Sequence, residues 1–136
     1  MTRFLLSLDK AVDTVFEAVQ SGARGETVVP KVPSAKITDV ALALMGDKKL
    51  PIVYTGIRPG EKVHEIMVSE DECFRTVERN GYYVILPVLP ELRGESKIEP
   101  ALDTEYSSKD NNLSVAELVQ LLQGSNTEIK RFIAGN

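Results

Sequence analysis

The residues best suited to chemistry lie in one loop, Arg58-Pro59-Gly60-Glu61-Lys62. Proline fixes its own φ and glycine tolerates a positive φ, so Pro59-Gly60 predicts the centre of a tight turn. That turn would project the guanidinium of Arg58 and the carboxylate of Glu61 toward one side. A guanidinium binds phosphate through two parallel hydrogen bonds, and a carboxylate accepts hydrogen bonds from sugar hydroxyls. The loop therefore suits a nucleoside diphosphate; an ordinary surface turn with solvated charges is the alternative that these residues leave open.

Other reactive side chains offer weaker candidates. His64 is the only histidine; it could act as an acid or base, but no motif marks a nucleophile beside it, and a structural or exposed role is preferred. One histidine and one cysteine, Cys73, cannot build a metal site or an internal disulfide framework, so no metal is expected. Lys31 is interpreted as a solvated loop charge rather than a phosphate contact.

The first predicted element is a helix between Ser7, a plausible N-cap, and Gly22, a plausible stop. Its apolar residues recur at helical spacing and are expected to lie in the core. They are Leu8, Ala11, Val12, Val15, Phe16 and Val19.

The remaining pattern alternates short strands with helices. An extended entry over residues 1–6 and a strand within 25–30 are expected, then a helix capped by Ser34 or Thr38 that ends at Gly46. A strand at 52–54 should lead into the loop, and helical spacing follows at 63–67. Asn80-Gly81 predicts a hairpin, the capping box Ser114 to Glu117 starts a helix that Gly124 should end, and 127–132 could add another.

Composition bounds the class of protein. The chain of 136 residues suits one domain. A net charge of −4 argues against a general nucleic-acid binder, which would carry a basic stripe. No signal peptide and no apolar run long enough to cross a membrane is found, so a cytoplasmic location is expected.

The loop resembles the Arg-Pro-Gly-Glu-Lys segment in the C-terminal half of bacterial polysaccharide-biosynthesis proteins. These are extended short-chain dehydrogenases that act on UDP-N-acetylglucosamine, as 4-epimerases or as 4,6-dehydratases with 5-epimerase activity. Further segments are similar in the same order along nearly the whole chain. They are Met1-Thr-Arg-Phe4, Val29-Pro-Lys-Val-Pro-Ser34, Val68-Ser-Glu-Asp-Glu72, Gly81-Tyr-Tyr83, Tyr106-Ser-Ser108 and Leu113-Ser-Val-Ala-Glu-Leu118.

The resemblance implies a fold and site roles. It implies a small mixed α and β domain over residues 1–136, with 87–112 an irregular lid or latch and 113–136 a C-terminal helical segment. It also implies that Arg3 and Arg58 bind the diphosphate of a UDP-sugar, UDP-N-acetylglucosamine, and that Glu61 binds the ribose.

The catalytic apparatus of that family is missing from these residues. No glycine-rich turn leads from a strand into a helix, as nicotinamide binding requires. None of the tyrosines has a lysine four residues later, although the family uses such a pair as acid and base. No catalytic residue is therefore assigned, and NAD(P) is expected on a dinucleotide-binding domain outside this chain, in cis or in trans.

The interpretation is the UDP-sugar-binding part of an epimerase or dehydratase that makes capsule, O-antigen or other surface sugars, without catalysis of its own. Two alternatives stay open: a standalone nucleotide-sugar binding or regulatory module, and a structural interaction domain. Homo-oligomerisation is also open, and the choice between epimerase and dehydratase is not made by these residues.

Overall fold

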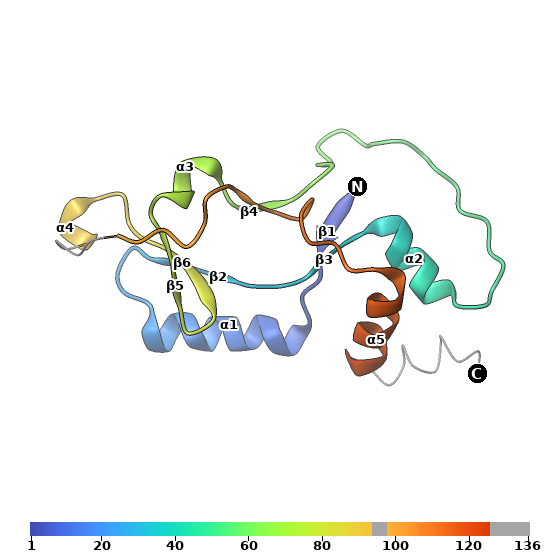
Figure 1. Cartoon of the computed structure of the whole chain (residues 1–136), viewed down its shortest axis with the longest axis horizontal. Coiled ribbons are helices and arrows are strands. Elements are labelled where there is room, and N and C mark those ends of the chain that lie inside the picture. Colours follow the sequence, from blue (N-terminus) through green and yellow to red (C-terminus); the bar gives the residue numbers. More distant parts are fainter. Residues whose placement is uncertain (94–97, 126–136) are drawn as a thin grey trace. The chain divides into compact units, whose positions relative to one another are not determined.

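The computed structural model describes residues 1–93 and 98–125, which form a small mixed α/β fold (Figure 1). Its elements fall into two compact units whose segments alternate along the chain. The loop unit holds Met1–Leu5, Pro33–Glu65 and the described residues from Ser108 onward. The hairpin unit holds Leu6–Val32 and Ile66–Ser107. That residues 1–136 act as a single domain stays a prediction.

In the loop unit, two short strands lead into a pair of packed helices. Strand β1 (Thr2–Phe4) pairs antiparallel with β3 (Ser34–Lys36), with Arg3 opposite Ala35. Helix α2 (Ile37–Met45) follows β3 directly and packs against α5 (Val115–Ser125). Ala35, Ala43 and Leu118 are the buried centre of this contact. The two alanines have small side chains, which leave room for the backbones to approach closely.

The capping box predicted for α5 is confirmed, because Glu117 accepts the N–H of Ser114 at 2.8 Å and Ser114 Oγ accepts the N–H of Glu117 at 3.4 Å. Gly124 does not end this helix, which continues to Ser125. The helix suggested for 127–132 lies outside the described residues.

In the hairpin unit, a three-stranded antiparallel sheet has the order β2 (Thr27–Pro30), β6 (Tyr82–Ile85), β5 (Thr76–Arg79). The predicted hairpin is confirmed: Asn80 and Gly81 have φ of 52° and 80°, as a type I′ turn requires. A second sheet pairs β4 (Ile66–Val68) with β7 (Tyr106–Ser107).

Short helices complete this unit. They are α3 (Glu70–Cys73), held by a capping box from Ser69 to Glu72, and α4 (Pro90–Arg93). The buried apolar cluster contains Val29, Val68, Cys73 and Ile85. The described part of 87–112, predicted to be irregular throughout, therefore contains two short elements, α4 and β7.

Helix α1 (Leu8–Ser21) has the predicted caps but not the predicted burial. Ser7 Oγ accepts the N–H of Lys10, and the N–H of Gly22 donates to Ala18. None of its residues is buried, so the prediction that its apolar stripe lies in the core is wrong within this unit. The physical reason is that the polar face of the helix is the one turned toward the hairpin.

Two local predictions before β4 are also wrong. Residues 52–54 form no strand: Val53 and Tyr54 are 76% and 80% exposed, and no described strand pairs with them. The helical turn at 63–67 is replaced by the start of β4. There the carbonyl of Val63 accepts from Thr2 at 2.9 Å, so a distant partner takes a group that a local helix would use.

Candidate functional site

The Arg58 turn has the geometry that its sequence predicts. The N–H of Glu61 donates to the carbonyl of Arg58 at 3.1 Å, and Gly60 has a φ of +85°. Proline followed by glycine at positive φ is the pattern of a type II turn. The side chain of Glu61 closes the turn a second time, because its Oε2 accepts the N–H of Arg58 at 2.9 Å. Arg58 and Glu61 are both exposed, and a Cβ on Gly60 would meet nothing within 4 Å.

Arg3 is attached to the C-terminal end of the same loop. Its Nη2 donates to the carbonyl of Lys62 at 2.9 Å and its Nη1 to the carbonyl of Thr2 at 2.6 Å. Its Nε lies 3.5 Å from the carboxylate of Glu65. Arg3 thus has a structural function as a bridge between β1 and the loop, and its remaining N–H groups are those that a phosphate would have to use.

The structure places the predicted site residues in or next to one loop. They differ in how far their charged groups are already paired. Within residues 1–93 and 98–125, Arg58 forms no ion pair with an acidic side chain. The guanidinium of Arg58 is consequently exposed and not paired with a carboxylate of the described residues, whereas Arg3 already faces Glu65. Lys31 lies in the hairpin unit instead, where it pairs with Glu78 and stands 4.4 Å from the ring centre of Tyr83, so its interpretation as a solvated charge is wrong.

A buried hydroxyl pair beneath the loop escaped sequence reasoning. Thr2 Oγ1 lies 2.8 Å from His64 Nδ1 and 2.7 Å from Ser108 Oγ, and Ser108 Oγ accepts the N–H of Glu65 at 2.8 Å. Thr2 is 4% exposed and Ser108 is fully buried. These contacts hold His64 and Glu65, at the C-terminal end of the loop, to Thr2 in β1 and to Ser108. Nothing local signals them, because the partners lie 62 and 106 residues apart.

One tyrosine and lysine meet in space although no sequence spacing predicts them. Lys10 Nζ donates to Tyr82 Oη at 3.2 Å and stands 4.6 Å from the centre of its ring. Tyr82 is only 7% exposed and lies in β6. The pair therefore attaches α1 to the sheet and offers a substrate little access.

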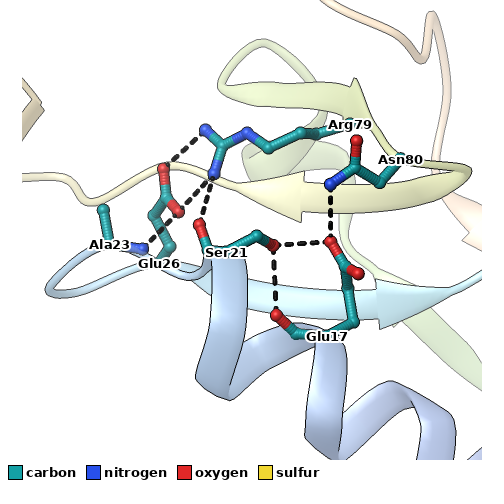
Figure 2. A network of polar contacts seen from close by, with 6 residues as sticks. All are labelled: Glu17, Ser21, Ala23, Glu26, Arg79 and Asn80. Carbon is teal, nitrogen blue, oxygen red and sulfur yellow. Dashed lines mark hydrogen bonds and ion pairs between the residues drawn. The ribbon is translucent and has the colours of Figure 1, made fainter.

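A network of polar contacts also joins α1 to the hairpin (Figure 2). Arg79 donates to both carboxylate oxygens of Glu26, at 2.8 and 2.9 Å, and to the carbonyl of Ser21 at 3.3 Å. Asn80 donates to Glu17 at 2.8 Å, and Glu17 also accepts from Ser21. The hydrogen bond from Arg79 lowers the pKa of Glu26, and the hydrogen bond from Ser21 is the main cause that lowers the pKa of Glu17.

Two kinds of feature are absent from the described residues. Across 1–93 and 98–125, no three His, Cys, Asp or Glu side chains are grouped so that they could hold a metal ion. None of the helices described here has the length and apolar character needed to span a bilayer.

Comparison with known proteins gives a consistent result. A family model described as "Polysaccharide biosynthesis protein" matches residues 1–87, which include Arg3 and the Arg58 turn. A UDP-N-acetylglucosamine 4,6-dehydratase (inverting) of Campylobacter jejuni is 38% identical over 131 residues, covering 90% of this chain and 39% of the relative. A UDP-glucose 4-epimerase of Rickettsia bellii is 36% identical over 132 residues, covering 90% of this chain and 38% of the relative.

A solved structure shares the fold. The X-ray structure of Pen from Bacillus thuringiensis superimposes with a TM-score of 0.78 at 26% identity, over 91% of this chain and 37% of that one. The chain thus spans less than half the length of each of these relatives.

Proposed function

Because the chain belongs to the polysaccharide biosynthesis protein family, we propose that it forms the UDP-sugar-binding part of a nucleotide-sugar dehydratase or epimerase. One observation carries the proposal: the Arg58 turn presents a guanidinium without an acidic partner in the described chain, beside the carboxylate of Glu61. A guanidinium matches the geometry of a diphosphate, and a carboxylate matches a ribose diol. The relatives are named for reactions on UDP-N-acetylglucosamine and UDP-glucose, which supports uridine diphosphate as the shared group.

In this proposal Arg58 binds the diphosphate, Glu61 accepts from the ribose, and Arg3 contributes its free N–H groups while it holds the loop on β1. The sugar would be UDP-N-acetylglucosamine or a close analogue, in the synthesis of surface polysaccharide. The cytoplasmic location stays a prediction from the sequence.

The described residues do not fit a nicotinamide cofactor. A pyrophosphate site of that kind needs a glycine-rich turn that opens a helix. Helices α1, α2 and α5 begin after Ser7, Lys36 and Ser114 instead. We therefore assign the cofactor, and the hydride and proton transfers that depend on it, to polypeptide outside these residues, and no catalytic residue to this chain.

Titration of UDP into the isotope-labelled chain, followed through amide chemical shifts, tests the proposal. We expect shifts centred on 56–65 and a Kd on the order of 1 mM, about 4 kcal/mol, since only part of a pocket is present. A hydrogen bond to a charged group contributes roughly 1.5–3 kcal/mol, so Arg58→Ala should weaken binding about 10- to 150-fold. Arg58→Lys should weaken it less, because the charge remains and only the planar pairing is lost.

Arg24→Ala is the matched control, because it removes one exposed guanidinium from the other unit and should leave UDP binding unchanged. Added salt should weaken binding, as for any partly exposed charge contact. Equal UDP shifts in the wild type and in Arg58→Ala would show that the loop is an ordinary surface turn, and would favour the structural alternative.

A further inference from the structure

Helix α1 presents an apolar face to the outside of its unit. Leu8 is 80% exposed, Val15 is 63% exposed and Val19 is 77% exposed. Val12 and Phe16 are 45% and 61% exposed. Their spacing places all five on one side of the helix, because residues four and seven positions apart fall on the same face. We call these five residues the outer face.

The opposite side of α1 is polar, and it is the side that contacts the sheet. Lys10 donates to Tyr82, Asn80 donates to Glu17, and Arg79 donates to the carbonyl of Ser21. These contacts, drawn in part in Figure 2, fix the rotation of the helix about its own axis. The outer face is consequently exposed by specific hydrogen bonds, and rolling the helix inward would leave those polar groups without partners.

An apolar face of this kind needs a cover, and its surroundings disfavour lipid. Contiguous apolar side chains on a protein surface mark sites of interaction. Helices that lie on membranes carry lysine and arginine on the polar side. In α1 the exposed charges are Asp9 and Asp13, and the one cation, Lys10, is engaged with Tyr82.

The comparisons indicate what the cover is. Helix α1 lies inside the residues that match the family. In the relatives, the matched region is joined to a longer polypeptide: this chain covers 39% of the Campylobacter jejuni dehydratase and 37% of the Pen chain. Each relative therefore carries additional structure, joined to its matched region, that can cover the outer face.

We propose that the outer face of α1 is the surface on which this chain docks to the remaining polypeptide of a family enzyme, in cis or in trans. The partner surface is apolar, with Phe16 as the central aromatic anchor, since aromatic side chains dominate such contacts. This inference rests on the proposed function, because it places the UDP-sugar-binding part on the part that would hold the cofactor.

The test compares two proteins. One is the isolated 136-residue chain. The other, the fusion, is the full-length Campylobacter jejuni dehydratase in which this chain replaces the matched segment. Hydrogen exchange of the α1 amides should be at least tenfold slower in the fusion than in the isolated chain. If the fusion folds and unfolds cooperatively, but its α1 amides exchange as fast as those of the isolated chain, the proposal is overturned. A fusion that does not fold also overturns it, because the chain then cannot dock on that polypeptide.

Substitution of the outer face separates docking from folding. Phe16→Asp should leave the Tm of the isolated chain within about 2 °C, because Phe16 is already 61% exposed there. In the fusion it should lower the Tm by at least 5 °C and return α1 to fast exchange. Gln20→Asp adds the same charge in line with the exposed Asp9 and Asp13, about a quarter turn from the centre of the outer face, and should change neither protein. A drop of equal size in both proteins with Phe16→Asp would show that the stripe is internal packing, against the proposal.

Two other occupants have their own outcomes. Sedimentation of the isolated chain should show a monomer; a dimer that Phe16→Asp dissociates would assign the face to a second copy and overturn the proposal. Co-sedimentation with anionic phosphatidylglycerol vesicles should show no binding; binding lost in Phe16→Asp would assign it to lipid, with the same consequence. UDP shifts at the Arg58 turn are measured separately in the isolated chain, so their absence would overturn the proposed function while slow α1 exchange in the fusion still supported docking.

Discussion

The carboxylate of Glu61 accepts the backbone N–H of Arg58 through Oε2, so one of its two oxygens is engaged before any ribose binds. Truncation of this residue would therefore disturb the turn as well as the proposed ribose contact. Glutamine keeps an oxygen for the N–H of Arg58 but loses the charge that strengthens a hydrogen bond from a hydroxyl. Glu61→Gln consequently separates the two effects, and Glu61→Ala does not.

We expect Glu61→Gln to weaken UDP binding severalfold and to leave the binding of inorganic pyrophosphate unchanged, because pyrophosphate has no ribose. Glu61→Ala should weaken the binding of both ligands, since the turn that positions Arg58 loses the hydrogen bond from the Arg58 N–H to the Glu61 carboxylate. Parallel shift titrations with the two ligands measure this. A loss of pyrophosphate binding in Glu61→Gln equal to its loss of UDP binding would remove Glu61 from the ribose.

The pair of Glu26 and Arg79 gives a prediction on pH. Arg79 lowers the pKa of Glu26 below its ordinary 4.5 by a hydrogen bond, and the Glu26 side chain is 6% exposed. A carboxyl whose pKa is depressed by folding stabilises the fold above its unfolded pKa, and this stability is lost as the pH falls through the folded pKa. Glu26→Gln should therefore cost about 1.5–3 kcal/mol at pH 7, the contribution of a hydrogen bond to a charged group.

At pH 3, below the ordinary pKa of 4.5, the difference between wild type and Glu26→Gln should shrink, because the carboxyl of the unfolded wild type then binds a proton that folding must release. Urea unfolding at both pH values is the measurement, with Asp47→Asn as an exposed carboxylate that should show little effect at either. An undiminished difference at acid pH would mean that Glu26 stabilises the unit by packing rather than by its charge.

At the scale of elements, the sequence predicted what local chemistry decides. The caps of α1, the capping box of α5, the Asn80-Gly81 hairpin and the Arg58 turn all rest on residues within four positions of one another. The strand predicted at 52–54 was wrong because a strand needs a pairing partner, which the local sequence does not identify. The prediction that the outer face of α1 lies in the core was wrong for the same reason. Helical periodicity shows that one face is apolar, but the contacts of Lys10, Glu17 and Ser21 decide which way that face points.

The sequence predicted the main residues of the candidate site, but it did not predict the contacts that hold their loop in place. Arg58 and Glu61 follow from the Pro-Gly turn between them. The contacts that hold the loop, from Arg3 to Lys62 and from Thr2 to His64 and Ser108, join residues 59, 62 and 106 positions apart. Such contacts depend on the pairing of β1 with β3, which no local pattern reports.

Alanine is expected to have opposite effects on stability at two glycines that both have open space around them. An added Cβ would meet nothing within 4 Å at either Gly81 or Gly124. Gly81 has a φ of +80°, where a side chain costs roughly 1–2 kcal/mol, whereas Gly124 lies in α5, where alanine is favoured over glycine by roughly 0.5–1 kcal/mol. We expect Gly81→Ala to destabilise and Gly124→Ala to stabilise the chain, by these amounts, in urea unfolding. A neutral or stabilising Gly81→Ala would contradict the hairpin geometry.

At the scale of the whole molecule, the chain carries the Arg58 turn in one unit and the outer face of α1 in the other, and we propose for each a use beyond the unit's own packing. A binding loop alone does not transfer hydride or protons, because that chemistry needs a cofactor and an acid–base pair positioned against the sugar. Lys10 and Tyr82 lie within hydrogen-bonding distance of each other, but Tyr82 is only 7% exposed. Docking through α1 would therefore join the proposed binding loop to the polypeptide that supplies this chemistry, and each proposal has its own test.

The isolated chain should accordingly neither bind a nicotinamide cofactor nor convert UDP-N-acetylglucosamine. We expect no change in NADH fluorescence on addition of the chain at concentrations where UDP shifts are clear, and no product by proton NMR after prolonged incubation with NAD⁺ and UDP-N-acetylglucosamine. The full-length Campylobacter jejuni dehydratase, assayed alongside, is the positive control for both measurements. Lys10→Met, which removes the ammonium beside Tyr82, serves as a probe: product from the wild type that disappears in Lys10→Met would identify that pair as catalytic. Product formation that survives Lys10→Met would place the missing chemistry elsewhere within these 136 residues, and either result would overturn the assignment of this chain to binding alone.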